Sequence, residues 1–251
     1  MSVSLQHGCG IPVDFPGFQN ARMPRDVVVF YDDFIAGSIS TGDIASTWDY
    51  TLLTTQATLP ALLDGTDGSE DEAGGILNLV TDATVGEGLS LQVNGEMFHL
   101  ADGYPLYFET RVNVGDISNV NFFVGLAVTD VAIIAGVTDQ IGFEMASDVL
   151  YAMATKDSND KTINMNITEA DDDWIRLAFF WDGVRYVHFS VDANDDGVFD
   201  YKGTLDADTS GHYIEQAMMM TPSIEVNTGA TATAERMYVD YILVMQQRFS
   251  E

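Results

Sequence analysis

From Val27 onward, short runs of apolar and β-branched residues alternate with clusters of glycine, aspartate and asparagine. In several runs, such as 105–114, the apolar side chains fall on every second residue, which is the period of a strand with one buried face. Only 131–136 is a candidate for a short helix. We therefore predict strands at 27–34, 47–54, 74–81, 88–94, 105–114, 119–129, 140–146, 149–155, 162–168, 173–182, 184–192, 219–226 and 235–247.

Many short strands separated by turn residues are typical of a β-sandwich or β-barrel. Asp182-Gly183, between two apolar runs, is a strong hairpin signal, because glycine adopts positive φ at little cost. The chain has 251 residues, 46% of them hydrophobic, which suffices for one large core. We predict an all-β fold, a two-sheet antiparallel sandwich formed by residues 26–251 as a single domain.

The first 25 residues differ from the rest of the chain. They contain three of the six prolines and follow no strand or helix period, so we predict an extended N-terminal arm over residues 1–25. Arg22 and Arg25 against Asp14 give this arm a net charge of +1, which leaves −30 on the other 226 residues. This contrast suits a tether that lies on another subunit; a disordered terminus is the alternative.

Charge restricts the partners. Ten lysines and arginines against 39 acidic residues give a net charge of −29, which repels nucleic acids and anionic lipids. Charged or small residues interrupt every apolar run well before the roughly 18 residues that a membrane span needs. We therefore expect neither nucleic acid nor membrane as a partner. The first residues lack the pattern of a secretion signal, so we expect assembly in a cytoplasm.

The segment 192–200 is the one candidate metal site. Asp192, Asn194, Asp196 and Asp200 place oxygen ligands around Gly197, as in the first nine positions of an EF-hand calcium loop. Position 12 would be Gly203 instead of a bidentate glutamate. The same residues also suit a hairpin turn closed by Asp and Asn side chains, which we favour over calcium because of the missing ligand.

Catalytic chemistry has no clear carrier in the sequence. Glycosidases need two carboxylates that flank one sugar bond, and Glu109, Glu144 and Glu225 each stand alone on a predicted strand. No nucleophile or nucleotide-binding motif is present, so we predict that the chain is not an enzyme and has no cofactor. The aromatic residues that could stack on sugars are more typical of a sheet interior: Tyr151, Trp174, Phe179, Phe180 and Trp181.

The order of strand sequences YFETRVNV, FFVGLAVTD, IGFEM, WIRLAFFWDG, VHFSVD and MYVDYILV resembles the concanavalin A-like (laminin-G-like) jelly-roll family. Three further segments, DDF at 32–34, residues 74–100 and VDYILVMQQR at 239–248, resemble jelly-roll capsid decoration (cement) proteins of tailed bacteriophages. This second resemblance implies a virion structural protein that binds the outer capsid surface, often as a homotrimer, and stabilises the shell.

Two functions follow from these resemblances. The first is capsid decoration: the body would sit on the capsid exterior, with the major capsid protein as partner and with Arg22 and Arg25 of the arm in contact with the shell. The strong negative charge favours the exterior, because packaged DNA would repel it. The alternative is a lectin-like module that binds carbohydrate through exposed aromatic residues, with or without calcium at 192–200.

Overall fold

The computed structural model describes residues 27–34, 50–54, 61–64, 75–130, 132–146, 148–167, 171–207 and 218–248. The predicted arm, with Arg22 and Arg25, lies outside the described residues. The predicted boundary of the domain at residue 26 therefore stays a prediction.

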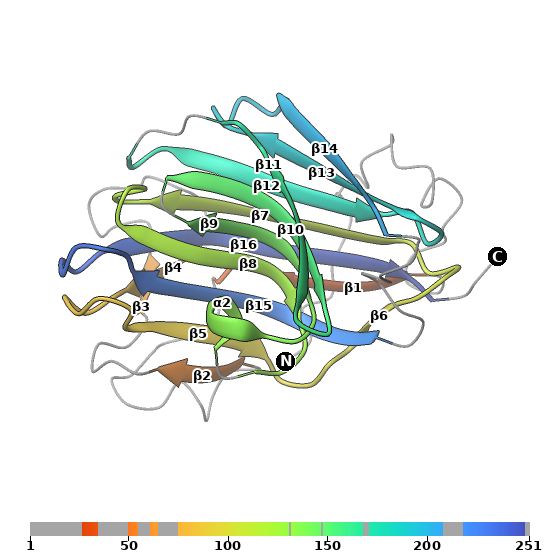
Figure 1. The fold of residues 1–251 in the computed structure, drawn as a ribbon, viewed down its shortest axis with the longest axis horizontal. Helices are drawn as coiled ribbons and strands as arrows, with labels where there is room; N and C mark the ends of the chain where they lie inside the picture. Colours follow the sequence, from red (N-terminus) through yellow and green to blue (C-terminus); the bar gives the residue numbers. More distant parts are fainter. Residues whose placement is uncertain are drawn as a thin grey trace.

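The described residues form two eight-stranded antiparallel sheets that stack face to face (Figure 1). Sheet A has the order β14 (Tyr201–Asp206), β13 (Tyr186–Asp192), β12 (Trp174–Trp181), β7 (Leu106–Val114), β16 (Arg236–Gln247), β4 (Gly75–Val80) and β3 (Ala61–Asp64), and β1 (Val27–Asp32) also pairs with β16. Sheet B has the order β11 (Asn159–Asn164), β10 (Val149–Lys156), β9 (Gln140–Ala146), β8 (Val120–Ala127), β15 (Met218–Thr228), β5 (Gly88–Val93) and β2 (Tyr50–Thr54), and β6 (Phe98–Leu100) also pairs with β15. The predicted all-β, two-sheet antiparallel sandwich is confirmed.

The core lies between the inner faces of the two sheets. The apolar residues at alternate positions of each strand supply its side chains. On β13, Val187, Phe189 and Val191 point inward and are fully buried, as their spacing predicts. Phe189 meets Phe143 of the opposite sheet edge to face, with ring centroids 5.4 Å apart. Edge-to-face aromatic pairs add stability beyond the area that they bury.

The sequence pattern missed three short strands, β3, β6 and β14, because a run of three to six residues carries little periodicity. The alternation in 105–114 indicated one buried face, which leaves the second face of β7 able to meet water. In the structure Tyr107 and Asn113 on that face are completely buried. Tyr107 packs in a small apolar cluster on the outer face of sheet A with Val27, Ala178, Phe180 and Met245.

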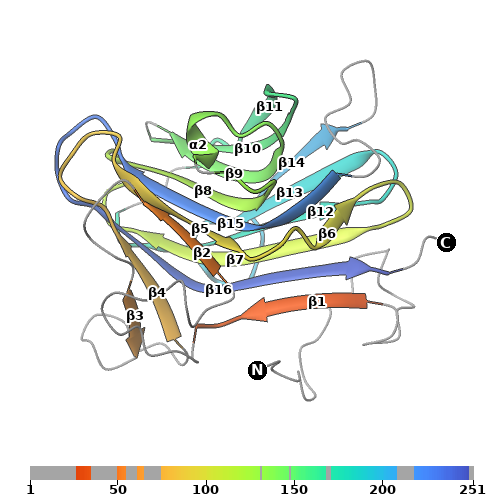
Figure 2. The same ribbon diagram turned by 90° about the horizontal axis from the view of Figure 1, so that it is seen from below.

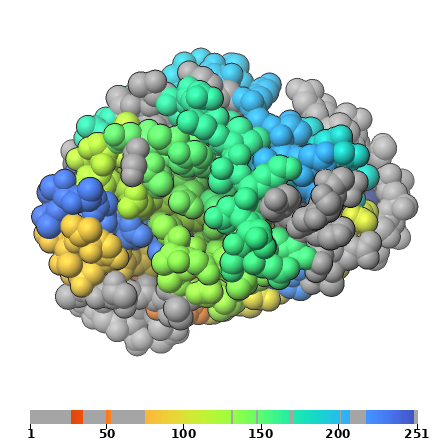
Figure 3. Space-filling model, viewed as in Figure 1, coloured from red at the N-terminus to blue at the C-terminus, as the bar shows by residue number. Residues whose placement is uncertain are grey.

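The predicted helix in 131–136 is present as α2 (Ile133–Gly136), in the connection between β8 and β9. Figure 2 shows the strands of sheet B bowed so that its outer face is concave, with α2 on that side. Figure 3 presents this face to the reader, with the green segments that include α2 and β10 at its centre. Within the part of the chain that the structure describes, no helix is long and apolar enough to cross a membrane.

Replacing Phe179 with alanine tests the contact between the sheets. Its ring stacks on Phe108 with centroids 5.0 Å apart and packs against Phe189, so the substitution leaves a cavity at the centre of the sandwich. We expect the free energy of unfolding to fall by about 3–5 kcal/mol in urea titrations. The exposed Val184, truncated to alanine, is the control and should change stability by about 0.5 kcal/mol or less. Equal effects of the two substitutions would contradict this assignment of the core.

Candidate functional site

The acidic loop 192–200 follows β13 on the outer face of sheet A, and its side chains bond mainly to the loop itself. Asp192 is completely buried and accepts backbone N–H groups of Asp196 and Gly197 at 3.2 and 2.9 Å. Asp196 in turn accepts the N–H of Val198, and Asn194 donates to Asp196. The backbone N–H of Asp200 donates to the carbonyl oxygen of Val191 and extends the pairing of β13 with β14. These are the bonds of a turn closed by aspartate side chains.

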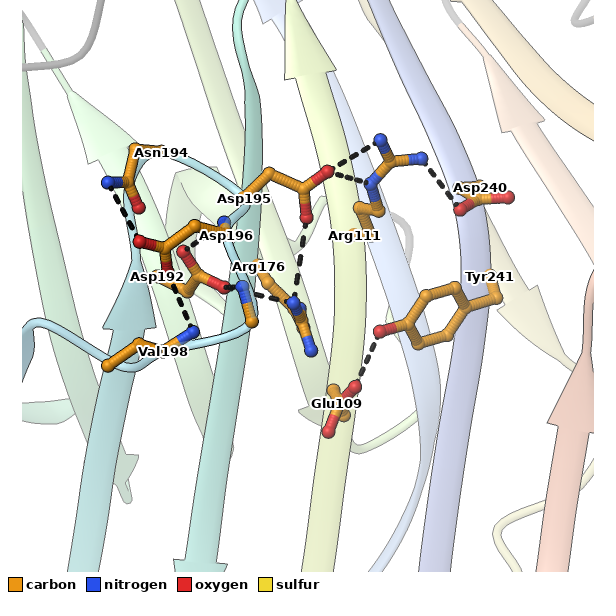
Figure 4. A network of polar contacts seen from close by, with 11 residues as sticks. Glu109, Arg111, Arg176, Asp192, Asn194, Asp195, Asp196, Val198, Asp240 and Tyr241 are labelled. Atoms are coloured by element: carbon orange, nitrogen blue, oxygen red, sulfur yellow. Dashed lines mark hydrogen bonds and ion pairs between the residues drawn. The ribbon is translucent and has the colours of Figure 1, made fainter. Parts of the chain in front are cut away.

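Two arginines on neighbouring strands pair with carboxylates of this loop (Figure 4). Arg176 on β12 pairs with Asp192 at 2.9 Å, and Arg111 on β7 pairs with Asp195 at 2.7 Å and with Asp240 at 3.0 Å. Asp195 lies between the two guanidinium groups and has a positive φ of 51°, which aspartate tolerates better than most residues. The network fixes the loop to β7, β12 and β16.

The structure therefore favours the turn over the calcium site at Asp192, Asn194, Asp196 and Asp200. Both oxygens of Asp192 already serve protein donors, and Arg176 lies where a cation would compete. Among the described residues, no group of three histidines, cysteines or acidic residues is placed to hold a metal ion. Calcium binding by this loop stays the untested alternative to the turn.

Next to this network, Glu109 on β7 accepts hydrogen bonds from the hydroxyl groups of Tyr107 and Tyr241. Burial raises the pKa of both tyrosines well above its ordinary value, and the Glu109 carboxylate adds to the effect. Neither tyrosine ionises in the physiological range. The group is a closed polar contact that ties β7 to β16.

The five aromatic candidates for sugar contacts divide into two groups. Phe179, Phe180 and Trp181 are almost completely buried, which confirms them as packing residues. Trp174 is half-buried on sheet A, where the Arg111 guanidinium lies 4.2 Å from the centre of its ring. Tyr151 is half-buried on the outer face of sheet B and belongs to neither apolar cluster of that sheet.

Tyr151 stands in a row of polar side chains across the concave face. Its register partners are Glu144 on β9 and Asn164 on β11, so all three side chains point to the same side. Asn164 is exposed and Glu144 is half-buried. The aromatic ring thus lies between a carboxyl group and an amide, at the edge of the sheet that β10 and β11 form.

Glu144 has an unusual proton affinity. Burial, together with the nearby carboxylates of Asp160 and Glu225, raises its pKa from 4.5 to about 7. A carboxyl group that titrates near neutrality on a concave surface is a candidate functional group.

Glu225 on β15 belongs to the same row. It pairs with Phe123 of β8, and Phe123 pairs with Glu144, so one strand separates the two glutamates. Their Cα positions are therefore about two strand spacings apart, roughly 9.6 Å. Their strands are distant in the sequence, which is why each glutamate looked isolated. The sequence did contain one signal for this site. The predicted strands 140–146 and 149–155 are close enough to form a tight hairpin, which pairs Glu144 with Tyr151.

Comparisons with known proteins agree on the fold. The sequence matches no family model and no curated protein. Among solved structures, a protein of unknown function, SO2946 from Shewanella oneidensis MR-1, matches with a TM-score of 0.62 at 14% identity over 96% of each chain. Peanut lectin matches with a TM-score of 0.56 at 11% identity, over 90% of this chain and 100% of the lectin.

Two further matches bear on the function. A glycoside hydrolase family 16 endo-glucanase from Bacteroides ovatus has a TM-score of 0.58 at 12% identity, over 85% of this chain and 98% of the enzyme. The CBM2 module of the Dit protein of Lactobacillus casei BL23 phage J-1 has a TM-score of 0.56 at 13% identity, over 90% and 98%. The concanavalin A-like jelly-roll is confirmed as the fold.

The prediction that the chain is not an enzyme is contradicted by the glucanases, which share its fold over most of its length. That prediction rested on the isolation of each glutamate in the sequence, and Glu144 and Glu225 in fact share one face. The narrower resemblance to capsid decoration proteins finds no counterpart among these matches.

Replacing Asp192 with alanine tests the closed loop. The substitution leaves two backbone N–H groups without their acceptor and Arg176 without its partner, so we expect a loss of about 3 kcal/mol in the free energy of unfolding. Asp173, exposed immediately before β12, is the control for loss of one carboxylate. The calcium site has a separate test. Melting curves of the native protein recorded with calcium and with chelator should coincide, and a calcium-dependent rise in Tm would show that the loop binds the metal.

Proposed function

We propose that the chain binds glycans on the concave outer face of sheet B, at the row formed by Glu144, Tyr151 and Asn164. The observation that carries the proposal is this row: an accessible aromatic ring held in register between a carboxyl group and an amide. Lectin, glucanase and carbohydrate-binding module share the fold and support the same class of ligand.

The residue types suit sugar chemistry. The ring of Tyr151 offers an apolar face for the C–H surface of a pyranose, while Glu144 and Asn164 accept and donate hydrogen bonds to hydroxyl groups. Thr162 and Asp160, both exposed on β11, extend the polar surface toward the edge of the sheet. With a net charge of −29, the protein repels anionic polysaccharides, so the ligand is an uncharged glycan.

Replacing Tyr151 with alanine should weaken glycan binding at least about tenfold, because it removes the stacking surface and leaves the sheet intact. The ligand is first identified on an array of neutral glycans, and affinities are then measured by calorimetry. Tyr186, exposed on the outer face of sheet A, is the control tyrosine, and its alanine variant should bind normally. Equal loss in both variants, or no loss in the Tyr151 variant, would remove Tyr151 from the site.

A second candidate function is hydrolysis of the bound glycan, which the proton affinity of Glu144 favours. With a pKa of about 7, Glu144 retains its proton in mildly acidic solution and can give it to the glycosidic oxygen. The bond between that oxygen and the anomeric carbon breaks, and water adds to the anomeric carbon. The water loses its proton to Glu225, whose carboxylate must first be released from the backbone N–H groups of Ile133 and Ile134.

The Glu144→Gln variant tests this second candidate. We expect release of reducing ends from a bound neutral glycan to fall at least about a hundredfold in the variant, since general acid catalysis contributes this much or more. In the native protein, hydrolysis should decline as the pH rises above about 7, because Glu144 then loses its proton. Glycan binding without detectable release of reducing ends from the native protein would exclude hydrolysis and leave the binding function.

Placement on a virion is a further proposal that is compatible with glycan binding. It comprises attachment to the major capsid protein on the capsid exterior, a homotrimer, and shell contacts by Arg22 and Arg25. The phage J-1 Dit module supports it only to the extent that a phage protein carries this fold. Co-purification of the chain with virions in many copies would support it, and absence from purified particles would refute it.

A further inference from the structure

The connection between β8 and β9 covers the centre of the concave face; we call its described residues, 128–130 and 132–139, the strap. Its two ends are tied to the sheet. At the first end, the side chain of Gln92 donates to the carbonyl oxygen of Val128 at 3.1 Å and accepts the N–H of Asp130 at 2.9 Å. At the second end, Thr138 accepts the N–H of Ser158 at 2.9 Å. Movement of the strap is therefore confined to its middle, which contains α2.

The middle of the strap covers an apolar floor. Ile133 and Val137 pack on Phe123, Ala127 and Met153, and all five are almost completely buried. Phe123 faces outward here, and the tip of its ring lies against Gly142 of β9. A Cβ atom added at Gly142 would lie 3.1 Å from Cζ of Phe123. Without the strap, an aromatic ring would be open to solvent between Glu144 and Glu225.

One carboxylate supplies the polar anchor of α2. Glu225 accepts the backbone N–H groups of Ile133 and Ile134 at 2.5 and 3.3 Å, the first turn of the helix. The surrounding floor is polar but incompletely bonded: within the described chain, the buried Ser90 Oγ and Gln140 Oε1 have no hydrogen-bond partner. Ser90 is the register partner of Glu225. Such groups on a binding face suit a ligand that brings its own hydroxyl groups.

We propose that the strap is an autoinhibitory cover: it occupies the inner half of the glycan site, and opening of α2 extends the site from Tyr151 across Phe123 to Ser90. The proposal rests on the glycan-binding function and concerns its regulation. The two aromatic rings are about two strand spacings apart, roughly 9.6 Å, so only an oligosaccharide can use both. Short sugars bind at Tyr151 whether the strap is open or closed.

Acidity controls the cover. Burial raises the pKa of Glu225. The hydrogen bonds from the two N–H groups and from Asn227 lower this pKa, and the carboxylate of Asp130 in the strap also raises it. Glu144 on β9 also faces Glu225, and Asp160 on β11 faces Glu144. Opening would hydrate Glu225 and return its pKa toward the ordinary value. The closed strap therefore holds a proton more tightly, and a rise in pH through the raised pKa favours the open strap.

Hydrogen exchange of the Ile133 and Ile134 amides tests the anchor without any glycan. The Glu225→Ala variant, which removes the acceptor, should accelerate this exchange at least about tenfold, and Glu225→Gln, which keeps an acceptor, should not. In the native protein, exchange corrected for its intrinsic pH dependence should be faster at pH 8 than at pH 5, and Glu225→Gln should abolish that difference. Unchanged exchange in the Glu225→Ala variant would overturn the anchor.

A strap-free variant tests the occlusion. Val128 donates to the carbonyl oxygen of Asp139, so these residues continue the pairing of β8 with β9, and an Asn-Gly turn can replace residues 129–138. We expect affinity for long neutral oligosaccharides to rise at least tenfold, with unchanged affinity for a disaccharide. Unchanged affinity for both ligands would overturn the proposal. Absence of glycan binding in all variants, despite faster amide exchange in Glu225→Ala, would refute the glycan function and the occlusion but retain the anchored strap.

If the strap-free chain does not fold, the Glu225→Ala variant takes its place in the same binding measurements, with Glu225→Gln as the conservative control. A selective gain for long oligosaccharides in Glu225→Ala alone would support the cover. An equal gain for short and long ligands, or none, would overturn it.

Discussion

The contact between the inner faces of the two sheets is the constraint on which the rest of the structure depends. Phe108, Phe179 and Phe189 of sheet A form a continuous aromatic group that meets Phe143 of sheet B. Every second residue of the central strands is committed to this interior, and the alternate residues are therefore presented on the outer faces. The chemistry of the molecule lies in what each outer face carries.

The two outer faces are protected in different ways. On sheet A, two arginines pair with Asp192, Asp195 and Asp240, so these three carboxylates already have partners within the protein (Figure 4). On sheet B, a strap held by Glu225 covers an aromatic floor, and the edge formed by β10 and β11 stays accessible. The second arrangement leaves polar groups available to a ligand, and this difference places the proposed site on sheet B.

Strand periodicity was sufficient to predict the sandwich, because alternation in segments such as 184–192 reports directly on a buried face. Local residue types also predicted the helix at Ile133–Gly136. The site was harder to predict, since it depends on strand order: β8 separates Glu144 from Glu225, and no local pattern specifies that neighbourhood. Likewise, the spacing of acidic residues in 192–200 suggested calcium, while the ion pair of Asp192 with Arg176 becomes visible only once β12 and β13 are paired.

A crystal structure of the protein with a bound neutral oligosaccharide would test the central claim most directly. The account predicts sugar rings on the outer face of sheet B, with one ring stacked on Tyr151 and its hydroxyl groups bonded to Glu144 and Asn164. A sugar bound instead on sheet A, beside the arginine network or Tyr186, would contradict it.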